Sequence, residues 1–225
     1  MISARRYLPT LLAAACLVGL APAGARGQGP TIGLKGGLNV STLSVEDPAN
    51  PDLEFDDETD FLAGAFIQCG RGWFALQGEV DYSRNGAKAQ GTDPAVTLNL
   101  DYLRVPVLLM GRLPSGKSPV RPMLYAGPQV AIETRCRVTG EEGGESQSVA
   151  CDSAELDDPL QTNNVEFGLV FGGGVEIPSG RFTMQLEARY NLGLTNINGG
   201  TDAAQVSVKN RGWTFALGLG MSGIF

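Results

Sequence analysis

The feature that most constrains this chain is an alternation of apolar and polar side chains with a period of two residues. It is clearest near the C-terminus, where Trp213, Phe215, Leu217 and Leu219 alternate with threonine, alanine and glycine. In residues 182–192, apolar side chains alternate in the same way with Thr, Gln, Glu, Arg and Asn. A period of two belongs to an extended strand, whose successive side chains point to opposite faces. The chain is therefore predicted to consist of strands with one apolar and one polar face.

Eight segments are predicted as strands, at residues 31–43, 61–68, 73–84, 96–112, 120–134, 165–177, 182–192 and 213–225. The connections between them alternate in length. The short ones are residues 69–72, 113–119 and 178–180, and the long ones are residues 44–60, 85–95, 135–164 and 195–210. Pro106 and Pro128 fall inside predicted strands, and because proline lacks a ladder donor we expect a bulge or local break there.

Strands joined by alternating short and long connections are typical of a transmembrane barrel with short periplasmic turns and long external loops. The predicted fold is all-β, an eight-stranded antiparallel up-and-down transmembrane β-barrel with both termini in the periplasm. Aromatic residues support this arrangement, because two interfacial girdles would result. They lie near the short turns (Phe74, Phe182, Phe225) and near the long loops (Phe61, Tyr82, Phe167, Tyr190, Trp213).

A soluble lipocalin-like binding barrel is the alternative, and it would turn the apolar face inward. The charged opposite face and the terminal Phe225 favour the membrane barrel. Phe225 is interpreted as an assembly signal, because a final strand ending in phenylalanine resembles the one recognised by the outer-membrane assembly machinery.

The N-terminal residues 1–25 are typical of an export signal, with Arg5 and Arg6, an apolar stretch over residues 8–20, and Ala-Gly-Ala at 23–25. Cleavage there, or as late as residue 27, leaves an outer-membrane β-barrel domain at residues 28–225. Losing Arg5 and Arg6 changes the formal charge from -7 to -9, which argues against a nucleic-acid partner. The predicted location is the bacterial outer membrane.

The charged face is predicted to line the lumen. An eight-stranded barrel is just wide enough to be filled by side chains, so these charges should form a paired structural core. The predicted lumenal cluster is Lys35, Glu79, Asp81, Glu166, Glu187 and Arg189, and Arg104 is a further candidate. Cys136 and Cys151 are predicted to form a disulfide across one polar segment, since export leads to an oxidising compartment.

The chain contains no histidine, which excludes Ser-His catalysis and His-dependent zinc hydrolysis. No catalytic, cofactor-binding or metal-ligating residue is predicted, and the chain is interpreted as not an enzyme. A carboxylate pair of Glu79 and Asp81, with Glu187 nearby, is the remaining catalytic alternative. Acidic residues gather in the first and third long connections, where divalent cations could bind and bridge lipopolysaccharide phosphates.

Short motifs resemble the small "porin family" or PorT-like outer-membrane β-barrel domain proteins. They are GLKGGLN at 33–39, LDYLRVPVLL at 100–109, YAGP at 125–128, GGGVE at 172–176 and ARYNLGLTNI at 188–197. The resemblance covers essentially the whole chain after the signal and implies a membrane barrel without catalytic residues.

The leading functional hypothesis is a non-enzymatic barrel with a structural or surface-interaction role, exercised through long acidic external loops. A narrow transport or small-ligand-binding barrel is the alternative. The expected partners are outer-membrane lipid, lipopolysaccharide and the assembly machinery, and the barrel is expected to be a monomer. The acidic residues of the loops are interpreted as solvated charge runs, and the binding of divalent cations there is the alternative.

Overall fold

The computed structural model describes residues 29–46, 55–89, 95–114, 116, 118–142, 145–151, 163–197 and 207–223. These residues form nine strands: β1 (Thr31–Glu46), β2 (Phe55–Arg71), β3 (Phe74–Ala89), β4 (Ala95–Arg112), β5 (Arg121–Glu142), β6 (Glu145–Ala150), β7 (Val165–Ser179), β8 (Phe182–Gly193) and β9 (Ser207–Ser222). No helix in this part of the chain is long and apolar enough to cross a membrane. The predicted signal at residues 1–25 lies outside the described residues.

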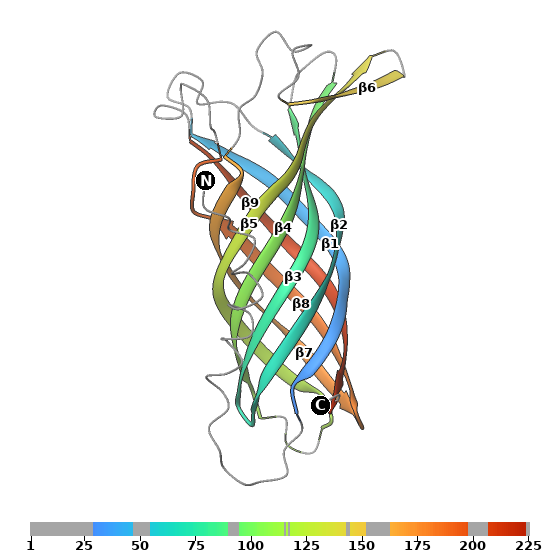
Figure 1. Cartoon of the computed structure of the whole chain (residues 1–225), viewed down its shortest axis with the longest axis vertical. Helices are drawn as coiled ribbons and strands as arrows, with labels where there is room; N and C mark the ends of the chain where they lie inside the picture. The colour runs from blue at the N-terminus through green and yellow to red at the C-terminus, as the bar shows by residue number, and fades with distance from the viewer. Residues whose placement is uncertain are drawn as a thin grey trace, which may run out of the picture.

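Eight of the nine strands close into a barrel, in which each strand pairs with its neighbours in sequence (Figure 1). The ring closes where β1 pairs with β9, and all pairings are antiparallel. This confirms the predicted eight-stranded up-and-down barrel. The ninth strand, β6, was not predicted; it pairs with the last residues of β5 and forms a hairpin that extends beyond the barrel (Figure 1).

The apolar face of the strands points outward. Leu34 on β1 is 71% exposed and is paired with Leu219 on β9, which is 59% exposed. Along β7 the exposed and buried residues alternate from Val165 to Phe171, and the buried Glu166 points into the barrel. A lipocalin-like barrel would have the opposite arrangement, so that alternative is excluded.

Two glycines shape the tightest turns. Gly72 between β2 and β3 has a φ of 62°, and Gly180 between β7 and β8 has a φ of 63°. This left-handed region suits glycine because it has no Cβ. These two turns lie at the same end of the barrel as the connection between β4 and β5, and the connections between β1 and β2, β3 and β4, and β8 and β9 lie at the other end (Figure 1). The connection between β3 and β4, at residues 90–94, was predicted to be long but is shorter than the one between β4 and β5, at residues 113–120.

The strands at the external end are longer than predicted. β2 begins at Phe55 and β5 ends at Glu142, so parts of the predicted loops are paired strand. These strand extensions could not be recognised in the sequence because they are polar. Strands that extend beyond a membrane need no apolar face.

Of the two outcomes predicted at the prolines, a bulge or a local break, the structure shows the local break. The β4–β5 pairing has the same register at Pro106–Gln129 and at Leu109–Ala126, and only the ladder between these pairs is interrupted. A proline removes a donor without adding a residue, so pairing is lost locally and the register is kept. The register of this pair shifts instead between Asp101 and Tyr102.

The aromatic residues lie on the outer surface near both ends of the strands. Phe74 and Phe182 are the first residues of β3 and β8, at the tight-turn end, and both are exposed. At the other end Tyr190 packs between Phe171 and Trp213, with ring centroids 5.4 and 5.2 Å apart. Phe225 lies outside the described residues.

Candidate functional site

The middle of the lumen contains a network of charged side chains from three strands. Lys35 comes from β1, Glu79 and Asp81 from β3, and Glu187 and Arg189 from β8. All five are buried. The strands are not neighbours, but alternate residues of each point inward, so their side chains meet across the closed barrel.

The distances define two linked ion-pair systems. Lys35 Nζ lies 2.7 Å from Glu79 Oε1 and 2.7 Å from Glu187 Oε2. Arg189 Nη1 lies 2.6 Å from the second oxygen of Glu79, and its Nη2 lies 2.8 Å from Asp81 Oδ2. Glu79 therefore joins the two cations. A buried charge is tolerated when it is paired and hydrogen-bonded in this way.

The structure does not bring Glu166 into this network. Its Oε2 accepts a hydrogen bond of 3.2 Å from Asn210 Nδ2 on β9. Arg104 on β4 is also buried, and its Nη2 donates to Asn85 Oδ1 at 2.7 Å. Of the six predicted lumenal residues, five thus form one cluster and Glu166 lies apart from it.

A phenylalanine fills the lumen beside the charged network. Phe66 on β2 is buried, and Lys35 Nζ lies 5.6 Å from its ring centroid. A Cβ added to Gly33 would collide with the Phe66 ring, and one added to Gly220 would come within 3.0 Å of it. These glycines therefore provide the space that the ring occupies.

An apolar cluster lines another part of the lumen, and it was not predicted. It consists of Ala75, Leu108, Met110, Met123, Tyr125 and Val170. Tyr125 connects it to the charged network, because its hydroxyl lies 3.3 Å from Glu187 Oε2. The lumen is thus filled by salt-linked and apolar side chains together.

The carboxylates of the network are poorly placed for acid-base chemistry. The side chains of Glu79 and Glu187 are 0% exposed and both are bound to Lys35. A general acid or base must reach a substrate proton within hydrogen-bond distance. Among the described residues no group of three or more His, Cys, Asp or Glu side chains is arranged to hold a metal ion.

The disulfide between Cys136 and Cys151 is present, with a Cα–Cα distance of 5.5 Å. It joins the external part of β5 to the residue that follows β6. Cys69 is not part of a disulfide. About half of the acidic residues predicted in the first and third long connections lie instead in the strands β1, β2, β5 and β6. The others lie outside the described residues, namely Asp47, Asp52, Glu54, Asp152, Glu155, Asp157 and Asp158.

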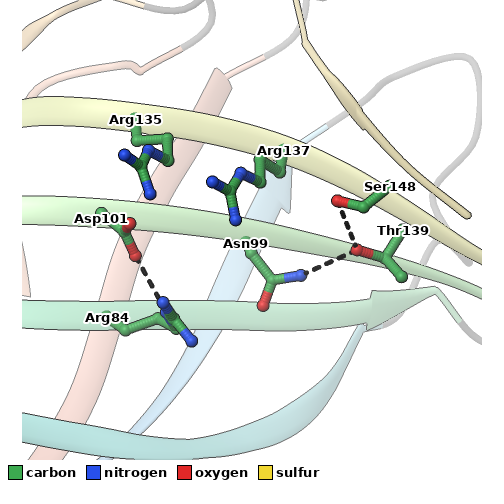
Figure 2. A pocket seen from close by; sticks show the side chains of 7 residues that line it. All are labelled: Arg84, Asn99, Asp101, Arg135, Arg137, Thr139 and Ser148. Carbon is green, nitrogen blue, oxygen red and sulfur yellow. Dashed lines mark hydrogen bonds and ion pairs between the residues drawn. The ribbon is translucent and has the colours of Figure 1, made fainter.

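A pocket of about 170 Å³ lies on the external part of β3, β4, β5 and β6. Its lining, shown in Figure 2, is Arg84, Asn99, Asp101, Arg135, Arg137, Thr139 and Ser148. Within it, Arg84 Nε lies 2.9 Å from Asp101 Oδ1. This arginine-rich pocket was also missed, although the spacing of Arg135 and Arg137 places both on one face of a strand.

The family model described as "outer membrane protein beta-barrel domain" matches residues 27–199. The chain belongs to this family. The outward apolar face, the closed antiparallel ring and the polar lumen are the architecture of a barrel that spans the bacterial outer membrane. The predicted location in the bacterial outer membrane is therefore confirmed.

Several solved structures are similar to this outer-membrane barrel. Neisserial surface protein A is 15% identical, with a TM-score of 0.48 and coverage of 87% of this chain and 99% of that one. AlkL in lipid bilayers is 15% identical, with a TM-score of 0.48 and coverage of 90% and 95%. The N-terminal barrel domain of Pseudomonas aeruginosa OprF is 10% identical, with a TM-score of 0.42 and coverage of 88% and 100%. A search of curated proteins finds no match.

Proposed function

We propose that this chain is a non-enzymatic and non-conducting outer-membrane barrel that acts at the cell surface through its external end. The observation that carries the proposal is the filled lumen. Lys35, Glu79 and Arg189 cross its middle with side chains that are 0 to 1% exposed. An ion would have to break these pairs to pass, which is unfavourable because it leaves buried charges without their partners.

The external end supports the surface role. β5 continues beyond the barrel and pairs with β6, and the disulfide between Cys136 and Cys151 fixes this hairpin (Figure 1). A rigid hairpin that extends from a membrane barrel can present its side chains to partners without large ordering costs.

Conductance across a planar lipid bilayer tests the proposal. The full chain, purified from outer membranes in detergent, should give no stable conductance steps. The double variant Lys35→Ala/Arg189→Ala removes both cations from the middle of the lumen and should allow small steps. Both proteins must first show heat-modifiable mobility on SDS gels, which reports a closed barrel.

The matched control is Arg121→Ala/Arg181→Ala, which removes the same charge near the tight-turn end and should remain silent. Stable steps from the unmodified chain would refute the proposal and favour the narrow transport barrel. A folded Lys35→Ala/Arg189→Ala variant that stays silent would show that these residues are not what closes the lumen.

A further inference from the structure

The external pocket contains three arginines that face away from the lumen. Arg84 on β3 is paired with Asp101 on β4, which is paired with Arg135 on β5. Their neighbours Ser83, Asn85, Leu100 and Tyr102 are buried side chains of the lumen. Because successive residues of a strand point to opposite faces, the pocket opens on the outer surface of the barrel.

The lining carries an excess of positive charge. It has three arginines and one acidic residue, Asp101, which forms an ion pair with Arg84 (Figure 2). Arg135 and Arg137 are exposed, and in the described part of the chain neither side chain has an ion-pair partner. The whole chain has a net charge of -7, so a concentration of positive charge at this point requires an explanation.

The pocket lies just outside the external aromatic residues. The guanidinium of Arg84 lies 5.7 Å from the centroid of the Phe61 ring, and Phe61 packs on Tyr82 with centroids 5.8 Å apart. Tyr82 precedes Arg84 by two residues on the same face, a distance of about 7 Å along a strand. Aromatic girdles mark the boundary between hydrocarbon and headgroups. The arginines are therefore at the depth of the headgroups in the outer leaflet.

We propose that this pocket binds a phosphate group of lipopolysaccharide, the phosphorylated lipid around the external end of the barrel. Guanidinium groups bind phosphate through paired, charge-assisted hydrogen bonds. Basic pockets on membrane proteins bind anionic lipid headgroups in the same way. Asn99, Thr139 and Ser148 add neutral polar groups suited to the hydroxyls of a phosphorylated sugar. This inference goes beyond the proposed function and does not depend on a closed lumen.

The disulfide holds together β5 and β6, which line one side of the pocket, although neither cysteine lines the pocket itself. Cys136 stands between Arg135 and Arg137 on β5, and Ser148 is contributed by β6 three residues before Cys151. Asn99 Nδ2 donates to Thr139 Oγ1 at 3.5 Å, and Thr139 Oγ1 lies 3.3 Å from Ser148 Oγ. These contacts link β4, β5 and β6 side by side (Figure 2). The pocket is therefore formed in advance of binding, which reduces the ordering cost.

Titration calorimetry with lipid A in detergent tests the site on the full chain purified from outer membranes. Bisphosphorylated lipid A should bind saturably. Because two charge-assisted contacts are lost, Arg135→Gln/Arg137→Gln should weaken binding by about tenfold or more. The matched control Arg121→Gln/Arg181→Gln changes charge equally at the opposite end and should bind as the unmodified chain does. Heat-modifiable mobility on SDS gels shows whether each variant is folded. If Arg135→Gln/Arg137→Gln does not fold, Arg135→Gln/Arg137→Lys replaces it in the binding measurement.

Two further ligands identify the source of the phosphate. Dephosphorylated lipid A should bind each protein weakly, and inorganic phosphate should not compete at millimolar concentration. Equal binding of dephosphorylated lipid A, or competition by inorganic phosphate, would overturn the lipid assignment. Unchanged affinity of the Arg135→Gln/Arg137→Gln variant, or no saturable binding by the unmodified chain, would overturn the site. Conductance is measured separately, so these failures do not affect the closed-lumen proposal.

Discussion

Replacing Arg189 with methionine should be among the most destabilising single changes in the barrel. Arg189 is the cation that pairs with both Glu79 and Asp81, at 2.6 and 2.8 Å, and its side chain is 1% exposed. Methionine fills much of the same volume but leaves Asp81 without an ion-pair partner among the described residues. Each charge-assisted hydrogen bond contributes about 1.5–3 kcal/mol. Removing the cation from a buried ion pair lowers the free energy of unfolding by about 3–5 kcal/mol, which is also the approximate sum of two such bonds.

The assay is urea unfolding of the barrel in lipid vesicles, followed by the fluorescence of Trp73 and Trp213, which are exposed on the barrel surface. The free energy of unfolding is obtained by linear extrapolation. Adding Asp81→Asn to the Arg189→Met variant should recover part of the loss, with a coupling energy of about 0.5–3 kcal/mol. Arg181→Met, in an exposed turn, should change stability by about 0.5 kcal/mol or less.

A loss below about 1 kcal/mol for Arg189→Met would refute the reasoning, because the cost of an orphaned buried carboxylate is its main term. No recovery with Asp81→Asn would be equally damaging. It would mean that the cost arises from packing and not from the charge of Asp81.

Two further predictions concern the glycines and the disulfide. Gly33→Ala should destabilise the barrel by about 1–3 kcal/mol, because its Cβ would collide with the Leu219 carbonyl and the Phe66 ring. Gly36→Ala on the same strand meets its nearest atom at 3.9 Å, so equal losses for the two variants in the same urea assay would contradict the argument. Cys136→Ser/Cys151→Ser should leave heat-modifiable mobility on SDS gels unchanged, because the barrel stays closed and only the external hairpin is loosened. Trypsin should cleave this variant faster after Arg135 and Arg137. An unchanged cleavage rate would show that pairing with β4 alone protects these sites.

The barrel itself could be predicted from the sequence because the period-two pattern gives both the strands and their faces. β8 and β9 alternate cleanly, so the inward positions of Glu187 and Arg189 followed directly. The alternation does not predict which of the inward side chains contact one another. Glu166 lies apart from Arg189 because the stagger between strands sets the height of each side chain, and alternation within one strand does not contain that information.

The apolar part of the lumen could not be predicted for a related reason. Residues 105–110 of β4 are apolar almost without interruption, so no alternation reveals which side chains point inward. The buried Leu108 and Met110 are therefore assigned only once the pairing with β3 and β5 fixes the register. The external pocket was missed because β5 was predicted to end at residue 134, one residue before Arg135.

The depth of a charge in this barrel determines what the charge can do. Inside the lumen, Arg189 is stabilised by ion pairs with carboxylates. On the outer surface, between the aromatic residues at the two ends of the barrel, the large exposed side chains are apolar. An arginine placed there would cost about 2–4 kcal/mol at the bilayer midplane and much less near the interface. The outward Arg84, Arg135 and Arg137 therefore limit how far the external end can sink into the hydrocarbon. A bound phosphate would strengthen this limit, so the pocket that recognises the lipid would also set the height of the barrel in the membrane.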